Sequence, residues 1–297
     1  MRTAWVLEKD VFTENGVEER LVSALVERQA DFYWSHEDSH GPNQDGLVKG
    51  AMYVKKAPPS PARPVVAYGS ISWVRRLLAK GGLVSSYFHP IAWMSLPELS
   101  CRSYYTHWNV HMLSRSFCFT TWKLLQDQWS DMFLKYGTMT STGRALFVKP
   151  DQNLKIFSGR VVNIHHFQDW SDSVLYCFSI PPEELCVVST PIHIDKEWRF
   201  FVFDRKVVTG SIYREGGRVT FGPANDVRAE DVAKMIAADE WQPDNAYVVD
   251  VGRSGIDYGL IEIGSPNCCC LYESDVGAFV DSASLLAEKE HKDLSPC

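Results

Sequence analysis

Apolar runs and amphipathic segments alternate through the first eighty residues of the chain. Two short apolar runs have the length of buried strands, and each is followed by a segment in which apolar positions recur at helical spacing. The expected strands are residues 3–7 and 65–68, and the expected helices are residues 18–28 and 71–79. This order of strand, helix, strand and helix predicts an α/β layer.

Strand patterns dominate the C-terminal half. β-Branched and aromatic residues gather in short runs that are separated by polar or glycine-rich turns. One run is closed by Pro150, which we expect to stop strand pairing because proline has no N–H. The expected strands are residues 147–149, 198–203, 207–208, 247–251 and 260–263, with the second and third forming a hairpin.

Two lysines flank the turn that follows the first of these strands. Lys149 ends the strand, so the sheet fixes its position, and Lys155 follows six residues later. Ser158 and Gly159 then predict a turn whose backbone N–H groups can approach phosphate oxygens, since glycine has no Cβ. This loop could fold over a polyphosphate.

Three charged residues lie inside apolar strand patterns. A lone cation such as Arg199 is costly among apolar side chains unless it meets an anion. Asp250 and Glu262 are each a single acid among aliphatic residues, and each could be a strand-end or edge residue that faces water. Two acids on neighbouring strands would also suit a shared hard cation with oxygen ligands, and magnesium is the natural candidate.

Four motifs occur in a fixed order along this half of the chain. They are F-V-K-P-x-x-x-x-K-x-F-S-G at 147–159, E-W-R-F-F-V at 197–202, V-V-D-V-G at 248–252 and I-E at 261–262. Over roughly residues 130–280 the chain resembles the ATP-grasp family, and more narrowly a branch of it common in phage and bacterial genomes. The preserved order makes the resemblance more specific than any single motif.

The resemblance implies an α/β fold with α+β lobes, in which two lobes grip ATP and Mg²⁺ and a small α/β domain precedes them. It assigns to nucleotide binding Lys149, Lys155, Ser158, Gly159, Val188, Ser189, Thr190, Ile192 and Glu197. In this set, residues 188–192 would form the hinge beside adenine. Catalytic roles fall to Arg199 and Lys155, and magnesium binding falls to Asp250 and Glu262.

Two positions depart from the family pattern. The asparagine that usually follows the second acid by two residues is Gly264 here, and a hinge position that is commonly acidic is Thr190. Asn267, three residues further on, is the candidate replacement for the missing magnesium ligand. Gly264 and Thr190 would favour the alternative of a nucleotide-binding or interaction protein whose metal site has decayed.

The resemblance divides the chain into three parts. Residues 1–130 are expected to form an N-terminal α/β domain of the kind that precedes ATP-grasp lobes, and residues 131–285 the nucleotide-binding domain. Residues 286–297, rich in charge, are expected to form a C-terminal tail.

Composition limits the classes of partner. The 297 residues are 45% hydrophobic, which is enough for a large core, and the net charge is −7 with an isoelectric point near 5.7. A protein that coats nucleic-acid phosphates is therefore disfavoured. The N-terminus lacks a signal-peptide pattern and no stretch approaches a membrane span, so we expect a cytoplasmic protein that has no contact with a membrane.

Histidines and cysteines offer weaker metal motifs. His107 and His111 have the spacing of two ligands on one helix, but no third ligand is evident, and a structural role is favoured. The cysteines have no C-x-x-C spacing, and the run 268–270 is more typical of a tight turn than of a metal or redox site.

The sequence thus predicts an ATP-dependent ligase that joins a carboxylate to an amine through an acyl phosphate, with a small molecule or a peptide as substrate. A kinase that uses the same grip on ATP is the first alternative. A nucleotide-binding or interaction protein without catalysis is the second. The sequence indicates no oligomeric state.

Overall fold

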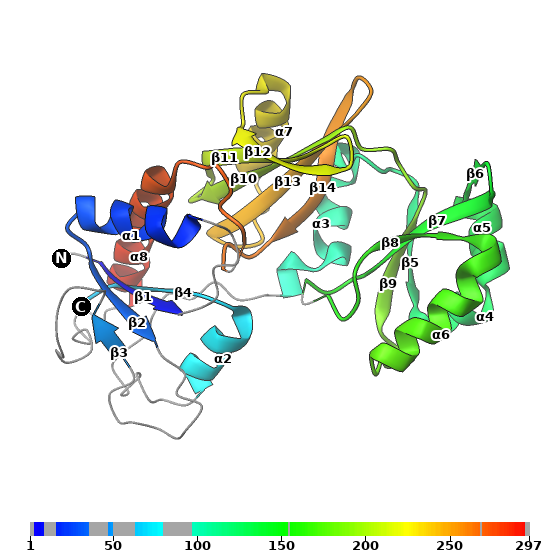
Figure 1. Ribbon diagram of the computed structural model, residues 1–297, viewed down its shortest axis with the longest axis horizontal. Helices are drawn as coiled ribbons and strands as arrows, with labels where there is room; N and C mark the ends of the chain where they lie inside the picture. The colour runs from blue at the N-terminus through cyan, green and yellow to red at the C-terminus, as the bar shows by residue number, and fades with distance from the viewer. Residues whose placement is uncertain are drawn as a thin grey trace.

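Three β-sheets follow one another along the long axis of the molecule (Figure 1). The computed structural model describes residues 3–8, 16–35, 47–49, 63–79, 97–153, 155–267 and 269–294. We call the three sheets the N-terminal sheet (β1 to β4), the outer sheet (β5 to β9) and the central sheet (β10 to β14).

The N-terminal sheet has the strand order β3-β2-β1-β4. Its centre is β1 (Ala4–Glu8), which is parallel to β2 (Asp31–Ser35) on one side and to β4 (Val65–Tyr68) on the other. At the edge, β3 (Leu47–Lys49) is antiparallel to β2. With α1 (Val17–Glu27) and α2 (Ile71–Ala79), this part confirms the four expected elements to within one residue.

The outer sheet is antiparallel and has the order β5-β9-β7-β6, with β8 also pairing with β7. Its strands are β5 (Phe117–Thr121), β6 (Thr138–Thr140), β7 (Gly143–Pro150), β8 (Arg160–Asn163) and β9 (Leu185–Ser189). Its helices are α4 (Trp122–Asp127), α5 (Trp129–Tyr136) and α6 (Phe167–Cys177), the last preceded by the short η3 (Ile164–His166). Their aromatic residues and the sheet form one core.

The sequence predicted that Pro150 would stop strand pairing. In the structure pairing stops on only one side of β7. Pairing with β8 ends at Val148, but Pro150 still pairs with Cys186 of β9, and the next N–H, of Asp151, donates to the carbonyl of Leu185. Successive N–H groups of a strand point to opposite sides. The N–H that proline lacks therefore belongs to the side where β8 has already ended.

The central sheet is antiparallel and has the order β12-β11-β10-β13-β14. Its strands are β10 (Lys196–Phe203), β11 (Lys206–Glu215), β12 (Arg218–Pro223), β13 (Ala246–Ser254) and β14 (Asp257–Gly264). The expected hairpin and the last two strands are confirmed, each longer than predicted. Helix α7 (Val227–Ala238) packs on this sheet and begins at Asp226, whose carboxylate accepts hydrogen bonds from the first-turn N–H groups.

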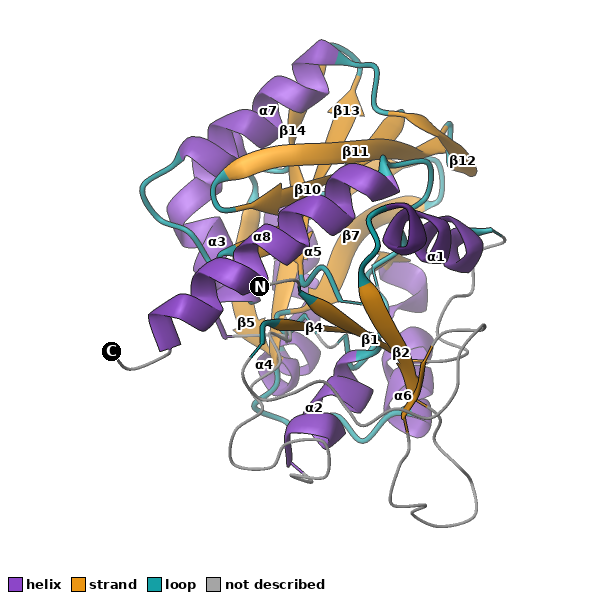
Figure 2. Ribbon diagram, turned by 90° about the vertical axis from the view of Figure 1, so that its left-hand side faces the viewer, coloured by secondary structure: helices purple, strands orange, loops and turns teal. Residues whose placement is uncertain are grey.

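Helix α8 (Val276–Leu294) lies beside α1 and joins the N-terminal sheet to the central sheet (Figures 1 and 2). Its buried face packs in one core with β1, β4, β10 and β13. Residues 286–294, expected as part of a tail, are the last turns of this helix, and Leu286 and Ala287 are buried in that core.

The segment that leads into the outer sheet contains η1 (Pro97–Leu99), α3 (Cys101–Trp108) and η2 (Asn109–His111). Because α3 ends at Trp108, His107 and His111 do not share one regular helix. The ring of His107 stacks on Trp241, with centroids 4.1 Å apart and planes at 7°, which supports the expected structural role.

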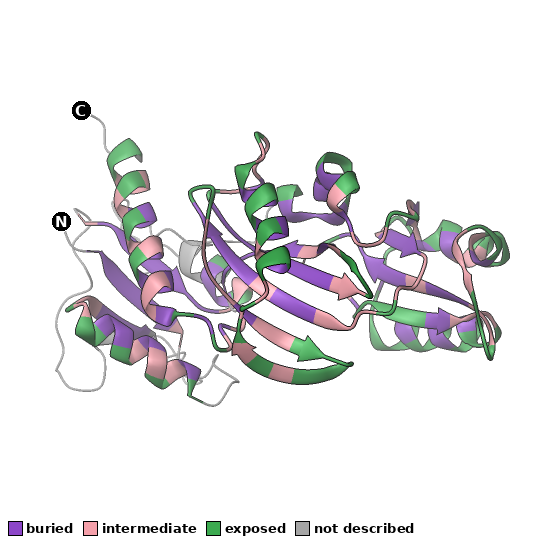
Figure 3. Cartoon of the chain, turned by 90° about the horizontal axis from the view of Figure 1, so that it is seen from above, coloured by how far each residue is buried: buried purple, intermediate pink, exposed green. Residues whose placement is uncertain are grey.

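Buried residues run along the strands, while the helices expose their outer faces (Figure 3). Strand β5 falls inside the expected N-terminal part, 1–130, yet pairs with β9. The division into three parts remains a prediction. Within the described residues, no helix is both long and apolar enough to cross a membrane.

Candidate functional site

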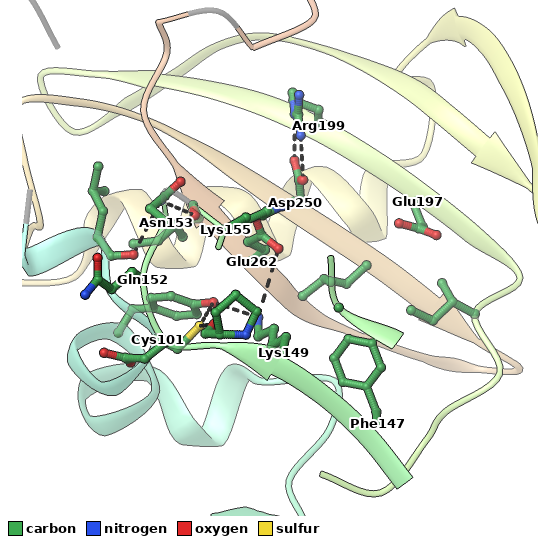
Figure 4. Close-up of a pocket in the computed structure, with 18 of the residues that line it drawn as sticks. Cys101, Phe147, Lys149, Gln152, Asn153, Lys155, Glu197, Arg199, Asp250 and Glu262 are labelled. Carbon is green, nitrogen blue, oxygen red and sulfur yellow. Dashed lines mark hydrogen bonds and ion pairs between the residues drawn. The ribbon is translucent and has the colours of Figure 1, made fainter. Parts of the chain in front are cut away.

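A cavity of about 350 Å³ lies between the central sheet and β7 of the outer sheet (Figure 4). Strands from both sheets, the loop after β7 and the first turns of α3 contribute to its lining. Seven residues expected in the site line it: Lys149, Lys155, Gly159, Glu197, Arg199, Asp250 and Glu262. The structure thus brings together both lysines, the arginine and both acids.

Lys149 is buried near the end of β7, against α3. Its ammonium group donates a hydrogen bond to the hydroxyl of Tyr104 at 3.1 Å and lies 5.3 Å from the centre of the Tyr105 ring. Burial alone lowers the pKa of Lys149, but Tyr105, Cys101 and Glu262 outweigh it, and the pKa lies above its ordinary value. Lys149 is therefore a fixed cation inside the cavity.

Glu262 of β14 faces two lysines. Its Oε1 lies 2.7 Å from the Nζ atom of Lys155, and its Oε2 lies 4.0 Å from that of Lys149. Burial raises the pKa of Glu262, but the two lysines outweigh burial, so the pKa lies below its ordinary value. The group is a carboxylate at neutral pH, as a metal ligand must be.

Arg199 and Asp250 form a two-pronged ion pair across neighbouring strands. They lie opposite each other on β10 and β13, and Nε and Nη2 of the guanidinium donate to the two carboxylate oxygens at 2.9 and 2.8 Å. Burial lowers the pKa of Arg199, but Asp250 outweighs it and the pKa lies well above its ordinary value. Asp250 is thus the anion that the sequence required for this arginine.

Glu197 and two tyrosines surround this pair. The hydroxyl of Tyr213 donates to Glu197 at 2.7 Å, and Arg214 lies 3.3 Å from the other carboxylate oxygen. The rings of Tyr213 and Tyr272 stack with centroids 5.3 Å apart, and both lie within 5.6 Å of the Arg199 guanidinium carbon. These rings hold the guanidinium by cation–π contact.

The two acids are suited to magnesium. Asp250 and Glu262 are opposite each other in the pairing of β13 and β14, and both line the cavity. Their oxygens are hard donors, and Oδ1 of Asp250, which accepts one hydrogen bond from Nε of Arg199, keeps a lone pair for a cation. In the described part of the chain no group of three histidine, cysteine or acidic side chains could hold a metal.

A comparison of the sequence with models of protein families gives a result that agrees with this arrangement of side chains. A family model described as ATP-grasp domain, R2K clade family 2, matches residues 119–282, more than half of the chain. The chain belongs to this ATP-grasp family. No curated protein matched it.

Solved ATP-grasp structures share the fold over nearly the whole of both chains. D-cycloserine synthetase DcsG is 15% identical, with a TM-score of 0.57 and coverage of 97% of this chain and 99% of that chain. The ligase PsnB, complexed with precursor peptide PsnA2 and AMPPNP, is 12% identical, with a TM-score of 0.53 and coverage of 96% and 98%. D-alanine–D-alanine ligase from Bacillus anthracis, complexed with ATP, is 10% identical, with a TM-score of 0.57 and coverage of 99% and 100%. The predicted ATP-grasp fold is confirmed.

The expected hinge of this ATP-grasp protein connects its two ATP-grasp sheets. β9 ends at Ser189 and β10 begins at Lys196. The side chain of Val188 is buried in the outer-sheet core, and the Thr190 hydroxyl donates to the carbonyl of Tyr136 at 2.8 Å. The lining residues identified in the described part of the chain include neither these hinge residues nor Ile192.

Of the remaining expected residues, Gly159 lines the cavity, whereas Ser158 and Asn267 are not among the described lining residues. A Cβ on Gly159 would lie 2.9 Å from the ring of Phe147 and 3.1 Å from the Cβ of Lys149, so only glycine allows the loop to approach β7 this closely. Asn267 is 4% exposed, and its N–H donates to the hydroxyl of Ser265.

The sequence did not predict three polar contributors to the site. Tyr104 lies in an aromatic stretch that is typical of core packing, and it does pack in the core, but its hydroxyl also reaches Lys149. Tyr213 lies in β11, beyond the apolar run at 207–208, and nothing in its spacing distinguishes it. Asn153 lies between Lys149 and Lys155, and that position was its only signal.

Proposed function

We propose that the protein is an ATP-dependent ligase that joins a carboxylate to an amine through an acyl phosphate. The observation that carries this proposal is the meeting of Lys149, Lys155 and Arg199 with two acids in one cavity between the sheets of an ATP-grasp fold. The ligases among the similar structures support it.

In the first step, a carboxylate oxygen of the substrate attacks the γ-phosphorus of ATP, and the bond from that phosphorus to the ADP oxygen breaks. Lys149 and Lys155 offset the negative charge on the transferred group. Lys149 is fixed by α3, whereas the side chain of Lys155 is 54% exposed and can turn from Glu262 to phosphate. Magnesium held by Asp250 and Glu262 would supply further charge neutralisation.

In the second step, the amine attacks the acyl carbon, the bond from carbon to the phosphate oxygen breaks, and the nitrogen loses a proton. The products are an amide, ADP and phosphate. Arg199 lies beside the metal-binding acids, so its guanidinium can stabilise the acyl phosphate and the tetrahedral adduct. We assign Glu197 to the mouth of the site and Ser158, Ser189, Thr190 and Ile192, with Val188, to the loop and hinge around the nucleotide.

The substrate class follows from the same proposal. A small molecule or a peptide would supply the carboxylate and the amine. The family model covers residues 119–282, so the N-terminal sheet lies outside it, and we assign to that sheet a part in substrate selection.

Thermal unfolding tests nucleotide binding. Mg-ATP at 100 times its Kd stabilises the native state by about 2.7 kcal/mol, and the melting temperature should rise accordingly. The shift should be smaller with ATP and EDTA, because Asp250 and Glu262 then repel the phosphates. No shift, together with no heat of binding in calorimetry, would refute nucleotide binding.

Product analysis tests the reaction. A ligase releases ADP and phosphate only when both the carboxylate and the amine are present, and the phosphate appears free in solution. A stable phosphorylated product from one acceptor would instead identify a kinase. Binding of Mg-ATP without turnover on any acceptor pair would favour the protein without catalysis.

A further inference from the structure

Asn153 lies in the loop between β7 and β8, between Lys149 and Lys155 in sequence, and lines the cavity (Figure 4). Its Nδ2 group donates to two backbone carbonyls, that of Ile263 at 3.1 Å and that of Leu99 at 3.4 Å. Ile263 directly follows Glu262. The carboxamide of Asn153 is therefore hydrogen-bonded to β14, the strand that carries Glu262.

These two hydrogen bonds determine which end of the amide is free. Both N–H donors of Asn153 point at carbonyl oxygens, and the reversed amide would set its own oxygen against them. Among the described residues, the hydrogen bonds of the Asn153 side chain are these two, and Oδ1 accepts none. Oδ1 is thus an oriented neutral oxygen in a cavity that already presents two carboxylates.

The space beside Gly264 is filled by this amide. A Cβ at position 264 would lie 3.6 Å from Oδ1 and 3.7 Å from Nδ2 of Asn153. The φ of Gly264 is outside the left-handed region, so the backbone there does not require glycine. The missing side chain at 264 leaves room for a carboxamide that arrives from the opposite sheet.

We propose that Asn153 supplies, through Oδ1, the third protein oxygen for a divalent cation held by Asp250 and Glu262. This inference rests on the proposed function, because the cation accompanies the nucleotide. The loop carrying Lys155 would then be tied to the metal as well as to phosphate. An oxygen ligand from the outer sheet would make metal binding depend on how the two sheets approach each other.

The competing role for Asn153 is a latch that only holds the β7–β8 loop on β14. Four variants separate the roles: Asn153→Ala, Asn153→Asp, Gly264→Asn and the double variant Asn153→Ala/Gly264→Asn. Gln152→Ala is the matched control, since it removes a neighbouring carboxamide that also lines the cavity. Mn²⁺ is titrated in the presence of AMPPNP, and free Mn²⁺ is measured by electron paramagnetic resonance. Binding of AMPPNP without metal is measured by calorimetry.

If Asn153 is a metal ligand, Asn153→Ala should lower the Mn²⁺ affinity by about tenfold or more, with little change in metal-free AMPPNP binding. Asn153→Asp keeps an oxygen and should retain or tighten Mn²⁺ binding. The double variant should recover much of the loss, because removal of the amide leaves space at 264, where the nearest remaining neighbour is Val248 at 3.3 Å. Gln152→Ala should leave the Mn²⁺ affinity unchanged.

Equal losses with and without metal in Asn153→Ala, with no recovery in the double variant, would overturn the inference in favour of the latch. So would a loss of Mn²⁺ affinity in Asn267→Ala with none in Asn153→Ala. If the unsubstituted protein binds neither AMPPNP nor Mn²⁺, the proposed function itself fails.

Discussion

The charged side chains of the cavity are paired with one another. Arg199 is paired with Asp250, Lys155 with Glu262, and Arg214 with Glu197. A triphosphate brings several negative charges, so it must replace a carboxylate at one of the lysines or bring a cation of its own. A divalent cation beside the two acids offsets both sets of charge. This balance is the physical reason to expect nucleotide and metal to bind together.

The Arg199–Asp250 pair makes a prediction about stability. The two side chains are 16% and 8% exposed, so Asp250→Asn leaves an uncompensated buried guanidinium and should cost about 3 kcal/mol of unfolding free energy. Arg199→Met should cost a similar amount. The double variant should cost much less than the sum, as urea denaturation would show.

The control for this cycle is the exposed pair Lys123–Asp127 of α4, whose side chains are 66% and 53% exposed. Its coupling energy should not exceed about 0.5 kcal/mol. Additive losses at Arg199 and Asp250 would contradict the assignment of this pair as a buried unit. The cycle is also a control for activity tests, because loss of metal binding in Asp250→Asn is interpretable only in folded protein.

Single residues also show where sequence reasoning succeeded. Arg199 could be predicted to meet an anion, because a cation among apolar strand residues needs a partner. The grouping of Lys149, Lys155, Arg199, Asp250 and Glu262 followed from their order along the chain, which resembles that of the ATP-grasp family. Tyr104 could not be predicted, because its contact with Lys149 spans 45 residues and α3 belongs to neither sheet motif. Contacts made by a connecting segment depend on packing, which leaves no periodic signal in the sequence.

Among the secondary-structure elements, short apolar runs were predicted well and α8 was not. Dense charge after residue 286 suggested a tail, but apolar residues at 279, 280, 283, 286 and 287 recur at helical spacing through the same region. Charge on the outer face of a helix is compatible with burial of the other face. The period of the apolar positions was the better signal.

Asp244, in the loop that leads into β13, should make the stability of the protein depend on pH. Burial raises the pKa of Asp244 from 3.8 to about 6. A carboxyl whose pKa is raised on folding favours the native state below the unfolded pKa, and this contribution is lost as the pH rises from about 4 to 6. Asp244→Asn should therefore stabilise the protein at pH 7 by about 1–2 kcal/mol and have little or no benefit at pH 4.

Urea denaturation at pH 4 and pH 7 measures this difference. The exposed residue Asp231 on α7 provides the matched substitution, Asp231→Asn, which should show no such change between the two pH values. A gain for Asp244→Asn that is equal at both pH values would mean that ionisation of Asp244 is not its cause.

Over the whole molecule, the N-terminal sheet and the central sheet share one core through α8. The sequence predicted the N-terminal and central sheets from their own patterns, but no pattern within a sheet indicates which face of another sheet it meets. Residues separated by two hundred positions or more, such as Trp5 and Phe279, are brought together there. The arrangement matters for the site because β10 and β13, which carry Arg199 and Asp250, run through both the core and the cavity.

Phe279 lies in the core that the N-terminal sheet and the central sheet share, and its replacement tests whether the two sheets unfold together. It is fully buried, with its ring centroid 5.5 Å from that of Tyr68 in β4 and 5.3 Å from that of Phe201 in β10. Phe279→Ala removes contacts to both sheets and should cost about 3–5 kcal/mol. Leu285→Ala, on the same helix but 67% exposed, should change stability by no more than about 0.5 kcal/mol.

The number of unfolding transitions shows whether the N-terminal and central sheets unfold together, which the midpoint alone does not show. If α8 is the coupling element, the unsubstituted protein unfolds in one transition, and Phe279→Ala separates it into two, with the N-terminal sheet melting first. Mg-ATP should then raise only the second transition, because the proposed nucleotide site lies between the central and outer sheets. Calorimetry with and without Mg-ATP distinguishes these cases. A single transition in Phe279→Ala that shifts as a whole with Mg-ATP would mean that the two sheets are coupled by contacts other than those of Phe279.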